Sequence, residues 1–366
     1  MKKLSLKIKK PNLSRAKLYA DRIRRERSPK AMDYEQAVED LPRITNETVA
    51  EHREEVLGSA RKFIYPLQHS KKRIVLISGS IFAAVIVGSF VYIMLALYSF
   101  QSTSTLVYRI TQVLPFPVAK AGSDYVSYES YLFELRHYMH YYETQQKVDF
   151  NAEAGKKQLE TYRKQALDQV VTDAYVKQLA AKNDISVSNN EVTDAIELLK
   201  SQNRLGSNDQ VLSDVLKEFW GWSIADFRRE LAQQLLAQKV VQTLDTGTNA
   251  RAQEALAKLR AGADFAAIAK EYSSDPTAPQ NGGEYPTSLD ENSRDIPPQV
   301  LKALQGLQPG QFSDVISTGS TLEIVKLISN DGGKLKAAHI TFQLQQLAKY
   351  VDPLKSQAKP KYFIKD

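Results

Sequence analysis

Two sets of polar residues in this 366-residue chain are of types that could do chemistry. His137 and His140 stand three residues apart on a predicted helix, a spacing that could hold a metal ion. No third ligand lies nearby in the sequence, so we expect these histidines to pack in an amphipathic helix. The other residues are Asp275 in SSDP, Glu323 in LEIVKLI and His339 in KLKAAHITF, which are far apart in the sequence and are not grouped by their spacing. Asp275 precedes a proline and could equally be a turn residue, so any role for these residues depends on the elements that carry them.

One segment dominates the rest of the sequence. Residues 74–98 read IVLISGSIFAAVIVGSFVYIMLALY and contain no charged residue. As a helix this segment reaches about 37 Å, enough to cross a hydrocarbon core of about 30 Å. A signal peptide has a shorter apolar core near the start of the chain, and a buried soluble helix rarely lacks a polar face over this length. The segment therefore predicts a single membrane-spanning helix.

The charge distribution predicts the orientation of that helix. Residues 1–73 hold 19 Lys and Arg against 10 Asp and Glu, whereas the remainder holds 30 against 32. Lys71, Lys72 and Arg73 abut the span, and its other flank has no charge before Arg109. Since positive residues stay on the cytoplasmic side, we expect the N-terminus inside and the C-terminal part outside. The chain has no cysteine, so an exported part cannot use disulfides.

The region after the span is predicted to begin with a small hairpin and continue as helices. Residues 118–127 read as two short strands around a turn at Gly122 and Ser123. Ser188 with Glu191 forms a capping box, and Ser223 is the expected cap of the last helix. The predicted helices cover about 128–148, 154–182, a stretch beginning at Ser188, 208–219, and Ser223–Leu244.

The stretches VAKAGSDYVSYESYLFEL, ISVSNNEVTDAIE and FWGWSIADFRRELAQQLLAQKVV carry a family resemblance. Over about residues 118–244 the chain resembles the N-terminal helical domain of SurA-like chaperones. Those proteins, and related extracytoplasmic foldases, combine this domain with parvulin-type prolyl isomerase modules. The resemblance implies a cradle for extended, apolar, unfolded polypeptide.

Residues 250–330 carry a second resemblance, to a parvulin domain. It rests on GADFAAIAKEYSSD, the pair Gly282 and Gly283, the helix after Pro298, LQPGQFSDV and LEIVKLI. The resemblance implies rotation of the peptide bond before proline, whose uncatalysed barrier is about 20 kcal/mol. Such a site needs no cofactor or metal, because it grips the proline ring and favours the twisted amide.

The resemblance carries over to the site residues only in part. Asp275 matches the family's acid or thiol position. Ile296 stands where the family often has Met, Val300 where it has Phe, and Glu323 where the last strand normally has His. The loop after Gly283 reads EYPTSL and lacks the family's glycine-aromatic turn. These differences imply weak or absent catalysis.

The first strand of a parvulin, which carries a histidine, is missing before this region. The sequence there is TLDTGTNA, but KLKAAHITF follows the last strand at 334–342. LEIVKLI, SNDGG and KLKAAHITF can form a hairpin, so we hypothesise a circular permutation in which His339 replaces the missing histidine near Asp275. Ala338, Ile340 and Phe342 would then share one strand face, with His339 on the other. A truncated second parvulin repeat is the alternative, although only 24 residues follow Phe342.

The predicted fold class is α+β, with one transmembrane helix, an all-helical chaperone domain and a small antiparallel-sheet domain. The expected segments follow one another along the chain: a basic, largely disordered cytoplasmic tail (1–73), the span (74–98), a stalk (99–117), the helical domain (118–246), the parvulin-like domain (247–344) and a C-terminal tail (345–366).

The predicted function is that of a foldase at the outer face of the cell membrane, with a degraded isomerase site. The expected catalytic residues are Asp275 and His339, and the expected substrate-binding residues are Ile296, Val300 and Glu323. The expected partners are unfolded or proline-containing exported polypeptides and membrane lipid, with no cofactor, metal or nucleic acid. A non-catalytic chaperone and an envelope scaffold are the alternatives.

Overall fold

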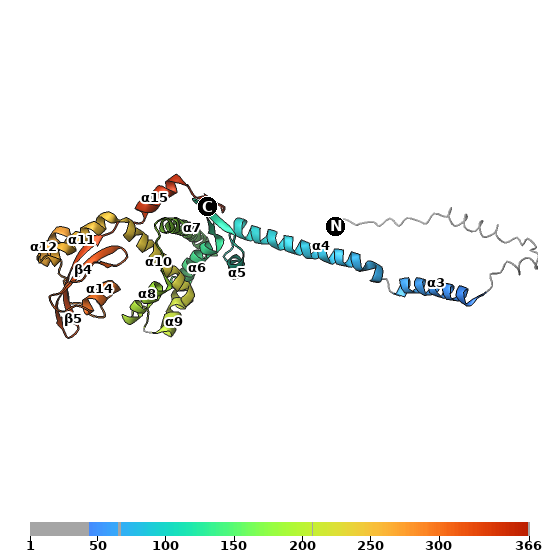
Figure 1. The fold of residues 1–366 in the computed structure, drawn as a ribbon, viewed down its shortest axis with the longest axis horizontal. Coiled ribbons are helices and arrows are strands. Elements are labelled where there is room, and N and C mark those ends of the chain that lie inside the picture. The colour runs from blue at the N-terminus through green and yellow to red at the C-terminus, as the bar shows by residue number, and fades with distance from the viewer. Residues whose placement is uncertain (1–43, 65–66, 207, 365–366) are drawn as a thin grey trace, which may run out of the picture. The chain divides into compact units, whose positions relative to one another are not determined.

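The computed structural model describes residues 44–64, 67–206 and 208–364 (Figure 1). Residues 1–43 of the predicted basic tail lie outside the described residues. Helix α3 covers Asn46–Ile64, within the segment that the sequence predicts to be a largely disordered tail. Helix α4 covers Leu67–Met94 and continues as a π-helical turn, η1, over Leu95–Ser99. Residues 74–99 are long and apolar enough to cross a membrane.

The predicted stalk contains a helix. Helix α5 covers Thr105–Val113, and Ser104 caps it by accepting a hydrogen bond from the Val107 backbone amide. Pro115 and Pro117 favour extended chain, in keeping with the predicted stalk. Those prolines lie after the helix, so they set where it ends and do not prevent it.

The hairpin and helices expected after this point are present. Strands β1 (Pro117–Ala121) and β2 (Asp124–Ser127) pair antiparallel, and Gly122 turns between them with φ +57°. The capping boxes at Ser188 and Ser223 are both formed. The helices that follow are α6 (Tyr128–Thr144), α7 (Glu153–Lys182), α8 (Asn189–Ser201), α9 (Asp209–Trp220) and α10 (Ile224–Leu244).

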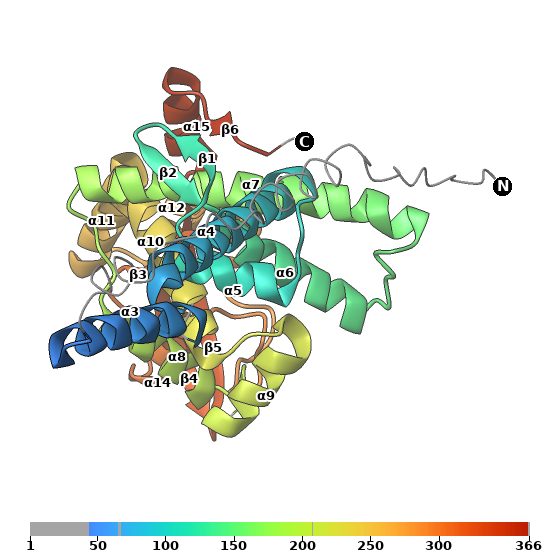
Figure 2. The same cartoon turned by 90° about the vertical axis from the view of Figure 1, so that its right-hand side faces the viewer.

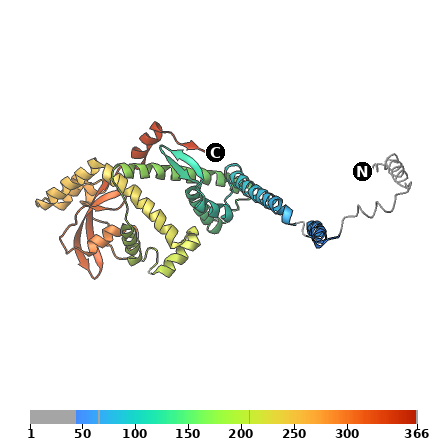
Figure 3. The same ribbon diagram turned by 45° about the vertical axis from the view of Figure 1, so that its right-hand side comes forward.

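The last residues of the chain return to this hairpin. Helix α15 covers Ala348–Gln357 and strand β6 covers Lys361–Tyr362, which pairs antiparallel with β1. Figures 2 and 3 show α15 and β6 beside β1 and β2. Val351 and Ile364 are buried in the same apolar cluster as Tyr128 and Tyr175. We call α5–α10, the β2-β1-β6 sheet and α15 the helical domain.

The remaining elements form a small domain around an antiparallel sheet. They are α11 (Thr246–Arg260), α12 (Phe265–Tyr272), α13 (Ala278–Asn281), α14 (Pro298–Gln305), β3 (Ile316–Ser317), β4 (Thr321–Asp331) and β5 (Lys334–Gln343). The strand order is β3-β4-β5. We call this part the sheet domain. The described chain is thus mostly helical with small antiparallel sheets, which confirms the α+β class.

Strand β5 is bonded on both of its edges. It pairs with β4 along its whole length, and Leu322 lies opposite Phe342 while Val325 lies opposite His339. On its other edge, residues 283–289 form bridges to β5, including a hydrogen bond from the His339 amide to the Gly283 carbonyl at 2.8 Å. The predicted antiparallel pairing of 338–342 with 322–327 is therefore confirmed.

The two faces of this hairpin pack against different layers. Leu322, Ile324, Ala338, Ile340 and Phe342 face α11 and α12 in one buried cluster. Val325, Leu327 and Ala337 face the other way, into a cluster with Val300, Leu301 and Leu304 of α14. The alternation predicted for β5 is confirmed, and it places His339 on the α14 side of the sheet.

Candidate functional site

The polar group at one end of the α14 face centres on His339. Its Nε2 atom lies 3.2 Å from Asp275 Oδ2, and its Nδ1 atom lies 3.3 Å from Glu323 Oε2. The three side chains are 18%, 19% and 8% exposed, so the group is mostly shielded from water. A neutral imidazole can donate to one of these carboxylates, and an imidazolium can donate to both.

Local structure fixes each of the two carboxylates. The Thr277 backbone amide and hydroxyl donate to Asp275 at 2.9–3.0 Å, in the turn that follows α12. Burial opposes ionisation of Asp275, but these donors and His339 outweigh it and hold the pKa of Asp275 below its usual value. Glu323 accepts from the hydroxyls of Thr321 and Thr341 at 2.9 and 3.0 Å.

The third side of His339 is covered by an aromatic ring. Tyr285 stacks on the imidazole with ring centroids 4.2 Å apart and an interplanar angle of 22°. Burial raises the pKa of Tyr285, and the negative charges of Glu323 and Asp275 raise it further, so the phenol stays neutral. Tyr285 belongs to the EYPTSL loop, which departs from the family pattern, and its contact with His339 is not predicted from the sequence. The position of Tyr285 two residues after the glycine pair was the available signal.

The glycine pair has a physical role in placing that loop. Gly283 has φ +83°, and a Cβ atom there would lie 2.3 Å from the His339 carbonyl oxygen. Only glycine permits this close approach of the loop to β5. The loop backbone then continues along the strand, where the Tyr285 amide donates to the Ala337 carbonyl at 3.0 Å.

The two expected apolar site residues differ in their surroundings. Ile296 is partly buried and packs at the edge of the α14 cluster, as Tyr285 does. Val300 is fully buried within that cluster, so its side chain supports the site from beneath and has no open surface. The structure thus brings Asp275, His339 and Glu323 together and places Val300 in the core.

The loop that carries Ile296 is held by the helical domain. The Arg204 guanidinium, in the α8–α9 connection, donates to the carbonyls of Ser293, Arg294 and Ile296. In return, the Arg294 guanidinium donates to the Gln202 carbonyl, and the Gln202 amide donates to the Pro298 carbonyl at 2.8 Å. We call these six residues (Gln202, Arg204, Ser293, Arg294, Ile296 and Pro298) the 202–294 latch. Nothing in the local sequence signals it, because its partners lie about ninety residues apart.

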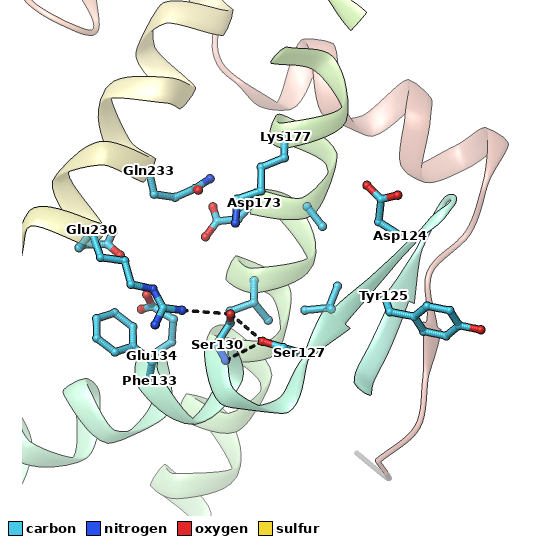
Figure 4. Close-up of a pocket in the computed structure, with 14 residues that line it drawn as sticks. Asp124, Tyr125, Ser127, Ser130, Phe133, Glu134, Asp173, Lys177, Glu230 and Gln233 are labelled. Carbon is cyan, nitrogen blue, oxygen red and sulfur yellow. Dashed lines mark hydrogen bonds between the residues drawn. The ribbon is translucent and has the colours of Figure 1, made fainter. Parts of the chain in front are cut away.

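The helical domain has hollows of its own. A cavity of about 320 Å³ lies between β2, α6, α7 and α10, and Figure 4 shows Asp173 and Gln233 facing each other across it. Burial, with the nearby charge of Glu230 and a hydrogen bond to it, raises the pKa of Glu134 to about 8. Burial and Glu230 also raise the pKa of Asp173 to about 6. Arg229 is engaged elsewhere, in a bidentate pair with Glu129 at 2.7 and 2.9 Å.

A second, aromatic hollow of about 140 Å³ lies nearby. Trp222 stacks on Phe133 with centroids 5.6 Å apart and on His137 with centroids 4.5 Å apart, while Trp220 lies 6.2 Å from Trp222. Burial lowers the pKa of His137 to about 4, so its ring is neutral near pH 7. His140 contacts the Glu218 carbonyl at 2.9 Å. Both histidines pack as expected, and the described residues contain no cluster arranged to hold a metal ion.

Comparison with known proteins agrees with this division. A family model described as the SurA-like N-terminal domain matches residues 67–241, and one described as the PPIC-type PPIASE domain matches residues 235–329. The chain joins a SurA-like N-terminal domain to a PPIC-type rotamase domain. The rotamase match ends within β4, so β5 and His339 lie outside it.

Individual relatives are similar over shorter stretches. The chain is 35% identical over 115 residues to Chaperone SurA of Albidiferax ferrireducens, covering 29% of this chain and 24% of that protein. It is 27% identical over 188 residues to Foldase protein PrsA of Caldanaerobacter subterraneus, covering 47% and 58%. It is 43% identical over 72 residues to Foldase protein PrsA of Streptococcus pneumoniae, covering 19% and 22%. The chain therefore spans about a quarter of the length of the SurA relative and little more than half of the length of the Caldanaerobacter PrsA relative.

Proposed function

We propose that this chain is a membrane-anchored foldase for exported polypeptides, with a parvulin-like site of weak prolyl isomerase activity. The observation that carries the proposal is the contact of His339 with Asp275 and Glu323 beneath the ring of Tyr285. The two domain matches supply the class of protein, and the geometry of this group supplies the candidate site.

The site would act on the amide before proline without forming a covalent bond. The apolar edge formed by Tyr285 and Ile296 would take the proline ring, and the shielded polar group would replace water around the amide. Such a site lowers a barrier of about 20 kcal/mol by favouring the twisted, less conjugated amide. Val300 lies in the core and the second histidine is replaced by Glu323, so the surface that grips proline is small. Weak activity follows from these two differences.

A circular permutation accounts for the origin of His339. The rotamase match stops at residue 329, yet β5 pairs with β4 along its length, forms bridges to residues 284 and 289 on its other edge, and carries a histidine into the site. A strand left over from a second, truncated repeat would not be expected to form hydrogen bonds along both of its edges within this domain. The tight turn at Asp331–Lys334 gives β5 a short route to that position.

The apolar helix supports the proposed location. Residues 74–99 would span the cell membrane, with the basic N-terminal part in the cytoplasm and both folded domains outside. Protease added to intact spheroplasts should digest the two domains and leave residues 1–73 protected. Protection of the C-terminal part instead would reverse the proposed topology.

Two alternatives to catalysis rest on the helical domain. A non-catalytic chaperone is favoured by the aromatic hollow of Trp220, Trp222 and Phe133, which could hold apolar segments of unfolded chain. An envelope scaffold would use the same domain to hold one folded partner.

One assay set separates these functions. The full chain in lipid nanodiscs should accelerate refolding of a model protein that is limited by proline isomerisation, and H339A should abolish the acceleration. The matched control is H52A, because His52 is exposed on α3, outside both domains. No acceleration together with suppressed aggregation of a denatured protein would favour the non-catalytic chaperone. If the chain neither accelerates refolding nor suppresses aggregation, the envelope scaffold is the favoured function.

A further inference from the structure

The apolar helix runs directly into the core of the helical domain. Ala96 and Leu97, at its end, are 4% and 0% exposed and belong to the main buried cluster. The Tyr128 hydroxyl donates to the Leu97 carbonyl at 2.6 Å, and the Tyr98 hydroxyl donates to the Pro117 carbonyl at 2.7 Å. No linker separates helix and domain. A bilayer around the helix must therefore end near Leu95, with the domain resting at its surface.

The first helix after this exit shows apolar side chains on its outer face. Val107 and Thr111 of α5 are buried against the domain. On the opposite face, Leu106 is 62% and Val113 is 80% exposed. These two positions are seven residues apart, so they lie on the same side of the helix. Phe100 and Leu114, which precede and follow α5 in the sequence, are 73% and 43% exposed as well. We call Phe100, Leu106, Val113 and Leu114 the exit patch.

The charge pattern around the exit patch continues that of the span. Between Ile74 and Ala119 the chain has one charged residue, Arg109, which is exposed on α5. A surface in contact with water ordinarily carries about a quarter of its residues as charges of both signs. The absence of acidic residues and the single arginine match the surface of a bilayer with anionic head groups.

Distance along the chain limits where the exit patch can be. Thr105, the first residue of α5, follows Ser99 by six residues. Even fully extended, those residues reach only about 20 Å. The exit patch is therefore held near the plane where the span leaves the bilayer.

We propose that the exit patch is a second membrane contact, in which α5 lies at the lipid interface and inserts Phe100, Leu106, Val113 and Leu114 among the outer head groups and upper acyl chains. The occupant is the lipid surface itself, because the patch is continuous with the spanning segment and shares its lack of acidic charge. The contact rests on the proposed membrane anchoring. It would fix the tilt of the helical domain on the membrane, because a single span allows rotation and a second contact does not.

Depth-dependent fluorescence quenching tests this contact on the full chain. The natural sequence has no cysteine, so a single introduced cysteine can carry an environment-sensitive NBD label. L106C and V113C report on the exit patch, V87C reports on the span, and D331C reports on an exposed turn of the sheet domain. Each labelled chain is reconstituted into vesicles of phosphatidylcholine and phosphatidylglycerol that contain lipid with a doxyl quencher, placed either near the head group or deep in the acyl chain.

The shallow quencher should reduce emission at positions 106 and 113 several-fold more than at position 331, and the deep quencher should act most strongly at position 87. Emission at 106 and 113 as unquenched as at 331, with position 87 quenched, would overturn the exit-patch contact and leave the anchor intact. In that case the exit patch faces water in vesicles that contain lipid alone, which would indicate that a protein partner covers it instead. Absence of quenching at position 87 would instead remove the anchoring on which the contact rests.

Discussion

The helical domain and the sheet domain each bury a group of carboxylates, and they treat them differently. In the helical domain, Glu134 and Glu230 face each other with Asp173 nearby, and the neighbouring Arg229 is paired with Glu129. In the sheet domain, His339 lies between Asp275 and Glu323, and three threonines donate to the carboxylates. Burial is common to both groups, so the supply of donors makes the difference.

The pKa shifts have opposite directions for this reason. Glu134 and Asp173 have raised pKa values because burial and like charges penalise the ionised form. Asp275 has a lowered pKa because its hydrogen bonds outweigh the burial. A carboxylate held ionised by donors can serve as a fixed polar group in a site. A carboxyl that keeps its proton makes the helical domain sensitive to pH.

The C-terminal part of the chain contributes β5 to the sheet domain, and α15 and β6 to the helical domain. Two truncations should therefore have the largest and most different effects on the stability of the two domains. A chain ending at Gly333 loses β5, and the sheet domain should unfold because both of its apolar clusters lose a wall. A chain ending at Leu344 keeps β5 and loses only α15 and β6, so the sheet domain should persist while the helical domain is weakened. Hydrogen exchange of α11 and β4 measures the difference. Equal protection of α11 and β4 in the two variants would contradict the central role of β5.

The buried pair Glu134 and Glu230 predicts that replacing Glu134 by the neutral glutamine (E134Q) stabilises the folded protein, and that the gain depends on pH. Glu134 binds a proton in the folded state up to about pH 8, whereas an unfolded glutamate releases it near pH 4.5. Stability is therefore lost as pH rises between these values and stays low above pH 8. E134Q removes that loss. The pKa shift is from 4.5 to about 8, and one pKa unit corresponds to about 1.4 kcal/mol, so the gain at pH 9 should reach at most about 5 kcal/mol, and it should vanish near pH 4.

Thermal unfolding of the full chain in detergent at pH 4 and pH 9 measures this gain. The exposed Glu160 on α7 supplies the control, because E160Q changes the same chemical group without burial. A gain for E134Q that is equal at both pH values would show that packing, and not the proton, is responsible.

Removal of His339 from the sheet domain should lower the stability of the protein, whereas E134Q in the helical domain should raise it. H339A takes away a donor shared by two shielded carboxylates, and the cost should be about 1–3 kcal/mol of unfolding free energy. The pKa of Asp275 should rise toward its usual value, so the protection against unfolding that its ionised form provides above pH 4 should shrink. Denaturant titration at pH 7 and pH 2 measures both effects, because the ionised Asp275 stops contributing only as pH falls below its usual pKa of 3.8. A cost that does not decrease at pH 2 would separate His339 from Asp275.

The sequence predicts much of the helical domain because its signals are local. Apolar periodicity and the caps at Ser188 and Ser223 lie within a few residues of the structures they specify. The hairpin of β4 and β5 is also local, with a glycine turn and strict alternation, which is why the position of His339 beside Asp275 could be predicted once the family resemblance supplied Asp275.

The missed features depend on contacts between distant parts of the chain. The pairing of β6 with β1 joins residues more than two hundred positions apart, and two residue pairs give no pattern in the sequence. Tyr285 reaches His339 only because Gly283 brings the loop against β5. Val300 has the same apolar type whether it lines a pocket or fills a core, so its burial could not be predicted from its identity.

The 202–294 latch predicts the smallest effect, and it connects the two domains directly. Arg204 donates to three carbonyls of the loop that carries Ile296, and a planar guanidinium reaches several acceptors that a lysine ammonium reaches less well. R204A should therefore raise hydrogen exchange of residues 290–298 and cost about 1 kcal/mol, with R204K intermediate. Exchange in α11 should not change, because that helix lies on the other side of the sheet. If the loop also binds proline, R204A should raise the KM of the full chain for a proline peptide more than it lowers kcat. Unchanged exchange in 290–298 would mean that the sheet domain positions its own loop and that the helical domain only rests against it.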